Sequence, residues 1–181
     1  MQTGLTIAIR PARSGDAPGI GAVHVAAWRS AYPGILSDVT LTGMSAAQQG
    51  AYYRTMIQRH GGVFVAVAGA SEQVVGFASV GRPRGSSLGD GEIHTLYVLD
   101  DWRELGLGRR LLRAGASHLA AEGCRSAFLW VLSDNPSRWF YQRLGGRAAM
   151  VGNTQVGGRT VPQTAYLWNP IEILIAATHS E

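Results

Sequence analysis

The stretch from residue 92 to residue 132 constrains the fold more than any other part of the sequence. A run typical of a strand, Glu92–Val98 (EIHTLYV), precedes a helical pattern over Arg103–Glu122 and then a continuous apolar run, Ala127–Leu132 (AFLWVL). Two strands joined through a helix are parallel neighbours in one sheet, with a right-handed crossover. The apolar run predicts a central strand that is buried on both faces.

The other predicted elements surround this unit with antiparallel strands and further helices. Val63–Ala68 (VFVAVA) and Gln73–Val80 (QVVGFASV) are separated by only four residues, which predicts an antiparallel hairpin. Further strands are expected at Leu5–Arg10, near Arg147–Val151 and at Val161–Trp168, and helices from Ser14 or Asp16 to about Arg29, from Ser45 to about Arg59 and over Pro136–Leu144. The segment Gly81–Gly91 is a predicted loop, and the tail after Pro170 has no assignment.

This order of elements predicts one domain of the α+β, or mixed α/β, class. Its core is a single mixed, mostly antiparallel central sheet flanked by helices. The domain is expected to span residues 1–181, with its core at about residues 5–168, because no linker or internal repeat divides the chain.

Composition excludes several classes of protein. Only 15% of the residues are charged and 46% are apolar, unlike a disordered or coiled-coil chain. Cys124 is the single cysteine, which excludes a disulfide framework and a cysteine-based zinc cluster, and no metal site is expected. The net charge of +4 comes from 16 arginines without any lysine and is spread along the chain, so nucleic-acid binding is not expected. No apolar run approaches ~18 residues and the N-terminus lacks a signal-peptide pattern, so we expect a cytoplasmic protein without a membrane partner.

The turn before the predicted helix has the composition of a diphosphate-binding site. Gly106 and Gly108 would let backbone N–H groups approach a ligand without side chains in the way. The first turn of the helix adds unpaired N–H donors and the positive end of the helix dipole. Arg103, Arg109 and Arg110 would add positive charge. The alternative is that these are two ordinary glycines of a glycine-rich chain, and a dinucleotide-binding G-x-G-x-x-G motif is disfavoured because its third glycine is absent.

Two segments of the chain resemble a known family. Arg103, Gly106 and Gly108 follow a strand in the pattern R-x-x-G-x-G, which resembles the acetyl-CoA signature of the GCN5-related N-acetyltransferase (GNAT) superfamily. The stretch Asn135–Gly145 (NPSRWFYQRLG) is similar to that family's N…F-Y…G segment, and the opening IAIRPARSGD also fits. The resemblance implies a GNAT-like fold and an acetyl-CoA-dependent N-acetyltransferase.

The resemblance also implies roles for individual residues. A strand would hold the pantetheine arm and the thioester carbonyl of acetyl-CoA, and the glycine turn would bind its pyrophosphate. The expected cofactor-binding residues are Leu96, Tyr97, Val98, Arg103, Glu104, Leu105, Gly106, Leu107, Gly108, Arg109 and Asn135. Tyr141 matches the tyrosine that protonates the departing thiolate. Asn135 and Tyr141 are one residue closer than in the usual family spacing, so either the helix starts with a tighter turn or Asp134 takes the asparagine position.

Direct attack needs a neutral amine, so a base is useful, and Glu92 is the expected catalytic base. It precedes Arg103 by the spacing found for the base glutamate of the histone-acetylating branch. The alternatives are that Glu92 is a solvated carboxylate at a strand edge, and that the proton goes to water or to His94, which is expected on the same face of the strand. Trp130 occupies the position of the base glutamate of the ribosomal-protein N-terminal branch, so that branch's mechanism does not transfer.

Aromatic residues are the candidates for the acceptor pocket. Trp28, Tyr32 and Trp130 are the expected substrate-binding residues, with ordinary core packing as the alternative. The loop Gly81–Gly91, with Arg82 and Arg84, is expected either to cover the acceptor site or to be disordered. The predicted reaction is acetyl transfer to a primary amine of a small molecule or a protein by direct attack in a ternary complex, and assembly as a homodimer is left open. The alternative function is a non-catalytic acyl-CoA-binding sensor.

Overall fold

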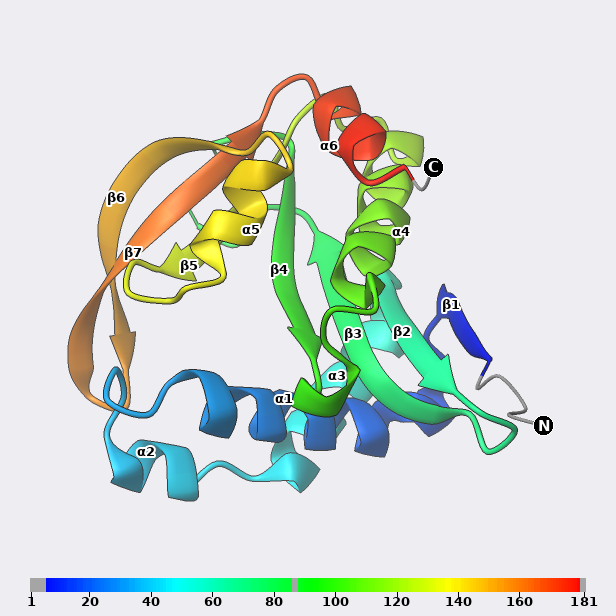
Figure 1. The fold of residues 1–181 in the computed structure, drawn as a ribbon, viewed down its shortest axis with the longest axis vertical. Helices are drawn as coiled ribbons and strands as arrows, with labels where there is room; N and C mark the ends of the chain where they lie inside the picture. Colours follow the sequence, from blue (N-terminus) through cyan, green and yellow to red (C-terminus); the bar gives the residue numbers. More distant parts are fainter. Residues whose placement is uncertain (1–5, 86–87, 180–181) are drawn as a thin grey trace.

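The protein, in a computed structural model that describes residues 6–85 and 88–179, is built on a seven-stranded sheet (Figure 1). The strands follow the order β1-β2-β3-β4-β5-β7-β6. Their bounds are β1 Ile7–Pro11, β2 Val63–Ala68, β3 Gln73–Gly81, β4 Gly91–Val98, β5 Ala127–Leu132, β6 Arg147–Val156 and β7 Arg159–Trp168. All neighbouring pairs are antiparallel except β4 and β5. The predicted class, a mixed and mostly antiparallel sheet flanked by helices, is confirmed.

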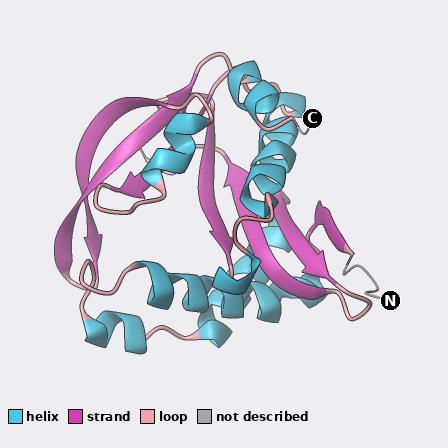
Figure 2. Cartoon of the chain, in the orientation of Figure 1, coloured by secondary structure: helices cyan, strands magenta, loops and turns pink. Residues whose placement is uncertain are grey.

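Helices lie on both sides of the sheet (Figure 2). Their bounds are α1 Ala17–Ala31, α2 Asp38–Thr42, α3 Ala46–Arg59, α4 Leu107–Ala121, α5 Arg138–Arg143 and α6 Glu172–Ala177, with single turns of 3₁₀ helix at Ser14–Asp16 and Asp100–Trp102. Within the described residues, no helix is both long enough and apolar enough to cross a membrane.

Alternate residues of β2 enter two different cores, as the two-residue period of a strand requires. Val65 and Val67 pack in the layer formed with α1 and α3. Ala66 and Ala68 pack in the layer formed with α4. Because both layers are filled, every residue of this central strand is buried.

The parallel strands β4 and β5 stay together only at one end. Their register pairs Gly91 with Ala127 and Glu92 with Phe128, and it goes no further. Beyond this point β4 remains paired with β3, and β5 remains paired with β7, while the two parallel strands diverge (Figure 1). The edge of β4 after Glu92 therefore has no strand partner on the side of β5.

A bulge in β4 changes which residues face each layer. Val80 pairs with Ile93 and Ser79 with Thr95, so His94 is an extra residue in β4. After the bulge, Tyr97 packs in the α1–α3 layer, whereas Leu96 and Val98 pack in the α4 layer. The bulge thus shifts the alternation of β4 by one residue, so that Ile93, Leu96 and Val98 lie on the same face of the sheet.

Several element boundaries differ from those expected. Helix α4 begins at Leu107 and not at Arg103, because Gly106, which precedes the helix, adopts φ +73°, in the left-handed region. Helices α2 and α6 were not expected, since each has only five or six residues and shows no clear period. Strands β6 and β7 are longer than predicted because the glycine-rich connection is a tight turn at Gly157 and Gly158, both with positive φ.

Candidate active site

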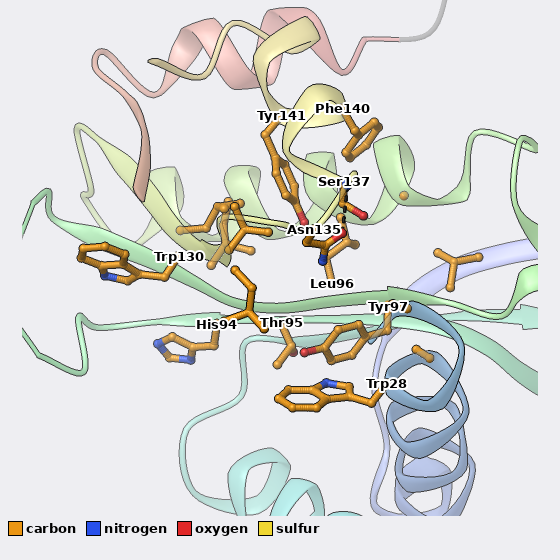
Figure 3. Close-up of a pocket in the computed structure, with 18 of the residues that line it drawn as sticks. Trp28, His94, Thr95, Leu96, Tyr97, Trp130, Asn135, Ser137, Phe140 and Tyr141 are labelled. Atoms are coloured by element: carbon orange, nitrogen blue, oxygen red, sulfur yellow. Dashed lines mark hydrogen bonds between the residues drawn. The ribbon is translucent and has the colours of Figure 1, made fainter. Parts of the chain in front are cut away.

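A cleft of about 830 Å³ opens where β4 and β5 diverge, and its size is in the range of ligand sites (Figure 3). It passes through the sheet, from the α4 layer, where Leu96 and Val98 line it, to the α1–α3 layer, where Tyr97 lines it. Of the expected site residues, the structure brings the following to this cleft: Trp28, Tyr32, Leu96, Tyr97, Val98, Arg103, Glu104, Gly106, Leu107, Gly108, Arg109, Trp130, Asn135 and Tyr141. Leu105, on the turn before α4, and Glu92 are not among its lining residues, and the Leu105 residue is 55% exposed.

One end of the cleft is the amino-terminal turn of α4. The first hydrogen bond of the helix runs from the Arg110 N–H to the Gly106 carbonyl, at 3.0 Å. The preceding N–H groups, of Leu107, Gly108 and Arg109, have no acceptor in the described part of the chain. Glu104 (φ +62°) and Gly106 (φ +73°) bend the turn that leads to these donors. Three free donors at the positive end of a helix form a site suited to a diphosphate.

The arginines near this turn are held by other groups. Arg103 forms an ion pair with Asp100, with 2.9 Å between Nη2 and Oδ1. The guanidinium of Arg109 donates two hydrogen bonds to the Ala177 carbonyl, and that of Arg110 donates to the Ile7 carbonyl. Arg110 does not line the cleft. The backbone donors, more than these side chains, therefore define the diphosphate end.

Asn135 joins the cleft to the start of α5. Its Oδ1 accepts a hydrogen bond from the Ser137 N–H at 2.9 Å, and its Nδ2 donates to the Tyr32 hydroxyl at 3.0 Å. The carbonyls of Asn135, Pro136 and Ser137 each accept from the N–H three residues later, so this segment is wound tightly. A tighter turn, one of the two alternatives for the short spacing to Tyr141, is what the structure shows, and the exposed Asp134 does not line the cleft.

Tyr141 points from α5 into the cleft (Figure 3). Its side chain is buried in the α4 layer. Burial, with a smaller contribution from Tyr32, raises the pKa of the Tyr141 phenol above its usual value of 10. The hydroxyl therefore keeps its proton throughout the neutral range.

The opposite end of the cleft, which we call the acceptor half, is lined by Trp28, Arg84, His94, Thr95, Tyr97 and Trp130. Figure 3 shows Trp28, His94, Thr95 and Tyr97 on the side of the sheet away from Tyr141. His24, behind Trp28, stacks on its ring and shares a hydrogen bond of 3.0 Å with the Tyr53 hydroxyl. Burial lowers the pKa of His24 to about 4, so this histidine is neutral.

Glu92 and His94 lie together, but only His94 reaches the cleft. The side chains of Glu92 and His94 are 6% and 8% exposed, and 3.9 Å separates the nearest carboxylate oxygen from His94 Nε2. Nε2 is 3.0 Å from the Arg82 carbonyl and so carries the ring proton, whereas Nδ1 has no partner in the described part of the chain. Burial and the Arg84 guanidinium lower the pKa of His94, against opposing effects of the Arg82 carbonyl and Glu92.

Sequence patterns did not single out several residues of this cleft. Phe140 lies in the predicted helix next to Tyr141, but no spacing distinguished it as a lining residue. Arg143 lies in α5 and Trp102 in the 3₁₀ turn Asp100–Trp102, and the others come from loops or strands that approach the cleft only in three dimensions. The missed lining residues include Trp102, Ser137, Phe140, Arg143, Thr154, Gln155, Val156, Gly157 and Gln163, whereas Arg84 belongs to the loop that was expected either to cover the acceptor site or to be disordered.

Comparisons with known proteins agree on one family. Residues 27–146 match the acetyltransferase (GNAT) family. An uncharacterized N-acetyltransferase, YuaI of Bacillus subtilis, is 31% identical over 169 residues, which are 93% of this chain and 96% of that protein. An L-methionine sulfoximine/L-methionine sulfone acetyltransferase of Pseudomonas aeruginosa is 31% identical over 144 residues, 78% of this chain and 80% of that protein.

The solved structures agree on the fold. The PaiA N-acetyltransferase of Thermoplasma acidophilum, in complex with coenzyme A, superimposes with a TM-score of 0.65 at 19% identity, covering 87% of this chain and 98% of that one. The family match over residues 27–146 and the relative that aligns over 93% of this chain show the family as well as the fold. The chain belongs to the acetyltransferase (GNAT) family and is an N-acetyltransferase.

Proposed function

We propose that this cleft binds acetyl-CoA and a primary amine together, and that the amine attacks the thioester directly. The observation that carries the proposal is the open edge of β4, which lines the same cleft as the free N–H donors of α4 and the Tyr141 phenol. These groups provide a binding site, a polarising strand edge and an acid along one continuous cleft. A sensor that only binds acyl-CoA has no need of the acid, and the relatives are named as acetyltransferases.

The residues present fit acetyl-CoA as the co-substrate. The N–H groups of Leu107, Gly108 and Arg109 would bind its diphosphate, because they lack acceptors at the positive end of α4. The unpaired edge of β4 over Leu96–Val98 offers backbone groups to the pantetheine amides and to the thioester oxygen. A backbone N–H placed at that oxygen would stabilise the negative charge that develops on it during attack.

The chemical step forms an N–C bond and breaks the C–S bond. The thiolate that leaves takes a proton from Tyr141, whose side chain points into the cleft and is protonated at neutral pH. The amine must lose a proton, and Glu92, the base expected from the sequence, lies behind His94. We therefore assign acceptance of the proton to His94 Nδ1, which is buried and has no partner in the described part of the chain, so a ring movement or a bridging water would connect it to the amine. Glu92 supports this step by favouring the protonated imidazole that results.

Replacement of Tyr141 tests the central step. In Tyr141→Phe, acetyl-CoA binding should be retained while thiol release falls by about 10²–10⁴-fold, the usual contribution of a general acid. Binding is followed by calorimetry, and release of coenzyme A by a thiol reagent with a panel of amines. Tyr52→Phe, on the exposed face of α3, is the matched control. Unchanged thiol release in Tyr141→Phe would refute the assignment, and an absence of any acetyl-CoA binding by the unaltered protein would refute the site itself.

A further inference from the structure

The charges that line the cleft are unequally distributed. Among the lining residues that the structure describes, Glu104 is the one carboxylic acid, and it belongs to the turn at the diphosphate end. Of the residues that the structure describes, none with an acidic side chain lines the acceptor half, although the guanidinium of Arg84 does. A polyamine or another acceptor with several positive charges would find no counter-charge there, and burying an unpaired charge is strongly unfavourable.

Arg84 is held in place by Glu92. The Arg84 backbone N–H donates to Glu92 Oε2 at 2.8 Å, and its Nη2 lies 3.5 Å from Glu92 Oε1 and 3.5 Å from the His94 carbonyl. The carboxylate of Glu92 does not line the cleft, so the charge presented to a ligand is that of the arginine. Both side-chain bonds of Arg84 use Nη2, and its side chain is 52% exposed. Its Nε and Nη1 have no acceptor in the described part of the chain, so they are available as donors to an anionic group.

The rest of the acceptor half is aromatic and closed at one side. Trp28, Tyr97 and Trp130 offer ring surfaces to an apolar group of the acceptor. The segment around Tyr32, Leu36 and Leu41 packs with residues of β5 and β7. A second contact brings Gly157, at the β6–β7 turn, against Thr40. This closure favours a small molecule over a peptide that would have to pass through the cleft.

We propose that the acceptor is a small amine that also carries a carboxylate and an apolar side chain, that is, an amino acid or a close analogue. Arg84 binds the carboxylate, the aromatic residues bind the side chain, and the amino group faces His94 and the thioester. Glu92 is then a positioning residue that holds Arg84. This inference rests on the proposed function and specifies its acceptor.

The test compares acceptors that differ only in the carboxylate. L-methionine, L-methioninamide and spermidine are each offered with acetyl-CoA, and thiol release gives kcat/KM. The amide has the less basic amine, so without recognition of the carboxylate it would be the faster acceptor. We expect L-methionine to be preferred over the amide by at least about tenfold, because a charge-assisted hydrogen bond at a half-exposed arginine is of that strength.

The variants assign this preference to a residue. In Arg84→Gln, the ratio of kcat/KM for L-methionine to kcat/KM for the amide should fall to one or below, while the binding of acetyl-CoA at the other end of the cleft stays unchanged. Arg84→Lys should restore part of the preference, and Arg54→Gln, an exposed arginine on α3, should leave it intact.

Three outcomes would overturn the inference. Equal use of L-methionine and its amide, or a preference for spermidine, would refute the acceptor class while leaving acetyl transfer standing. A preference for L-methionine that survives in Arg84→Gln would refute the role of Arg84. Binding of acetyl-CoA without acetylation of any amine would refute the proposed function and this inference together.

Discussion

Replacement of Gly106 by alanine separates the role of the α4 turn in binding from its role in stability. Gly106 has φ +73°, a conformation that disfavours an L-residue by about 1–2 kcal/mol. A Cβ built there meets no atom within 4 Å, so the substitution adds strain without a steric clash. For a domain of this size, that strain should lower the melting temperature by about 2–8 °C.

The same methyl group also stands beside the free N–H donors of α4. If these donors bind the diphosphate, Gly106→Ala should weaken acetyl-CoA binding by at least about tenfold, or ~1.4 kcal/mol. Gly123→Ala is the matched control, because Gly123 has φ +92°, meets no atom within 4 Å and follows the other end of α4. Gly123→Ala should lower the melting temperature by a similar amount and leave the affinity for acetyl-CoA unchanged.

Thermal unfolding of the free proteins and calorimetric titration with acetyl-CoA measure the two effects separately. The reasoning fails if both alanine variants bind acetyl-CoA with the affinity of the unaltered protein. It also fails if both lose affinity equally, since the effect would then come from general destabilisation of α4.

Three further predictions concern buried polar groups. The pKa of His94 is lowered from 6.5, so with a weakly basic amine the acetylation rate should rise with pH only below about 6.5. His94→Gln should abolish this rise. If the rate of the variant still rises with pH in this range, His94 is not the base. His24 has a pKa of about 4 in the folded protein against 6.5 when unfolded, so the unfolded chain binds more protons and the unfolding free energy should fall as the pH drops from 6.5 to 4, by about 3 kcal/mol. Urea titrations of the unaltered protein and of His24→Gln measure this difference, which should disappear in the variant. Tyr32→Phe removes the acceptor of the Asn135 amide and should lower the unfolding free energy by about 1–3 kcal/mol; urea titration showing no loss would mean that this bond is not maintained in solution.

The strand–helix–strand unit around α4 could be predicted because its signals are local. Alternation and apolar runs identify β2 and β5, and a glycine pair after a strand indicates a helix start with free donors. The mixed pairing of the sheet then follows from connection lengths and handedness, whereas the place of β7 between β5 and β6 was not predicted.

The details of the site depended on long-range pairing, which no local pattern reveals. The bulge at His94 and the end of β4–β5 pairing at Glu92 arise from the register of three strands. Together they leave Glu92 out of the cleft and His94 at its surface. The loop that contains Arg84 was expected either to cover the acceptor site or to be disordered, but its bond to the Glu92 carboxylate, which holds Arg84 there, was not predictable from composition.

The short pairing of β4 with β5 has a mechanical consequence. The three-stranded β5–β7–β6 unit is attached to the remainder of the sheet by hydrogen bonds at one corner only. Coenzyme A bound along the free edge of β4 would contact both sides of the gap between β4 and β5. Its binding should therefore reduce the mobility of the carboxyl-terminal strands as well as that of the turn that it contacts. Amide exchange in β5 and β7 should accordingly slow when coenzyme A is added.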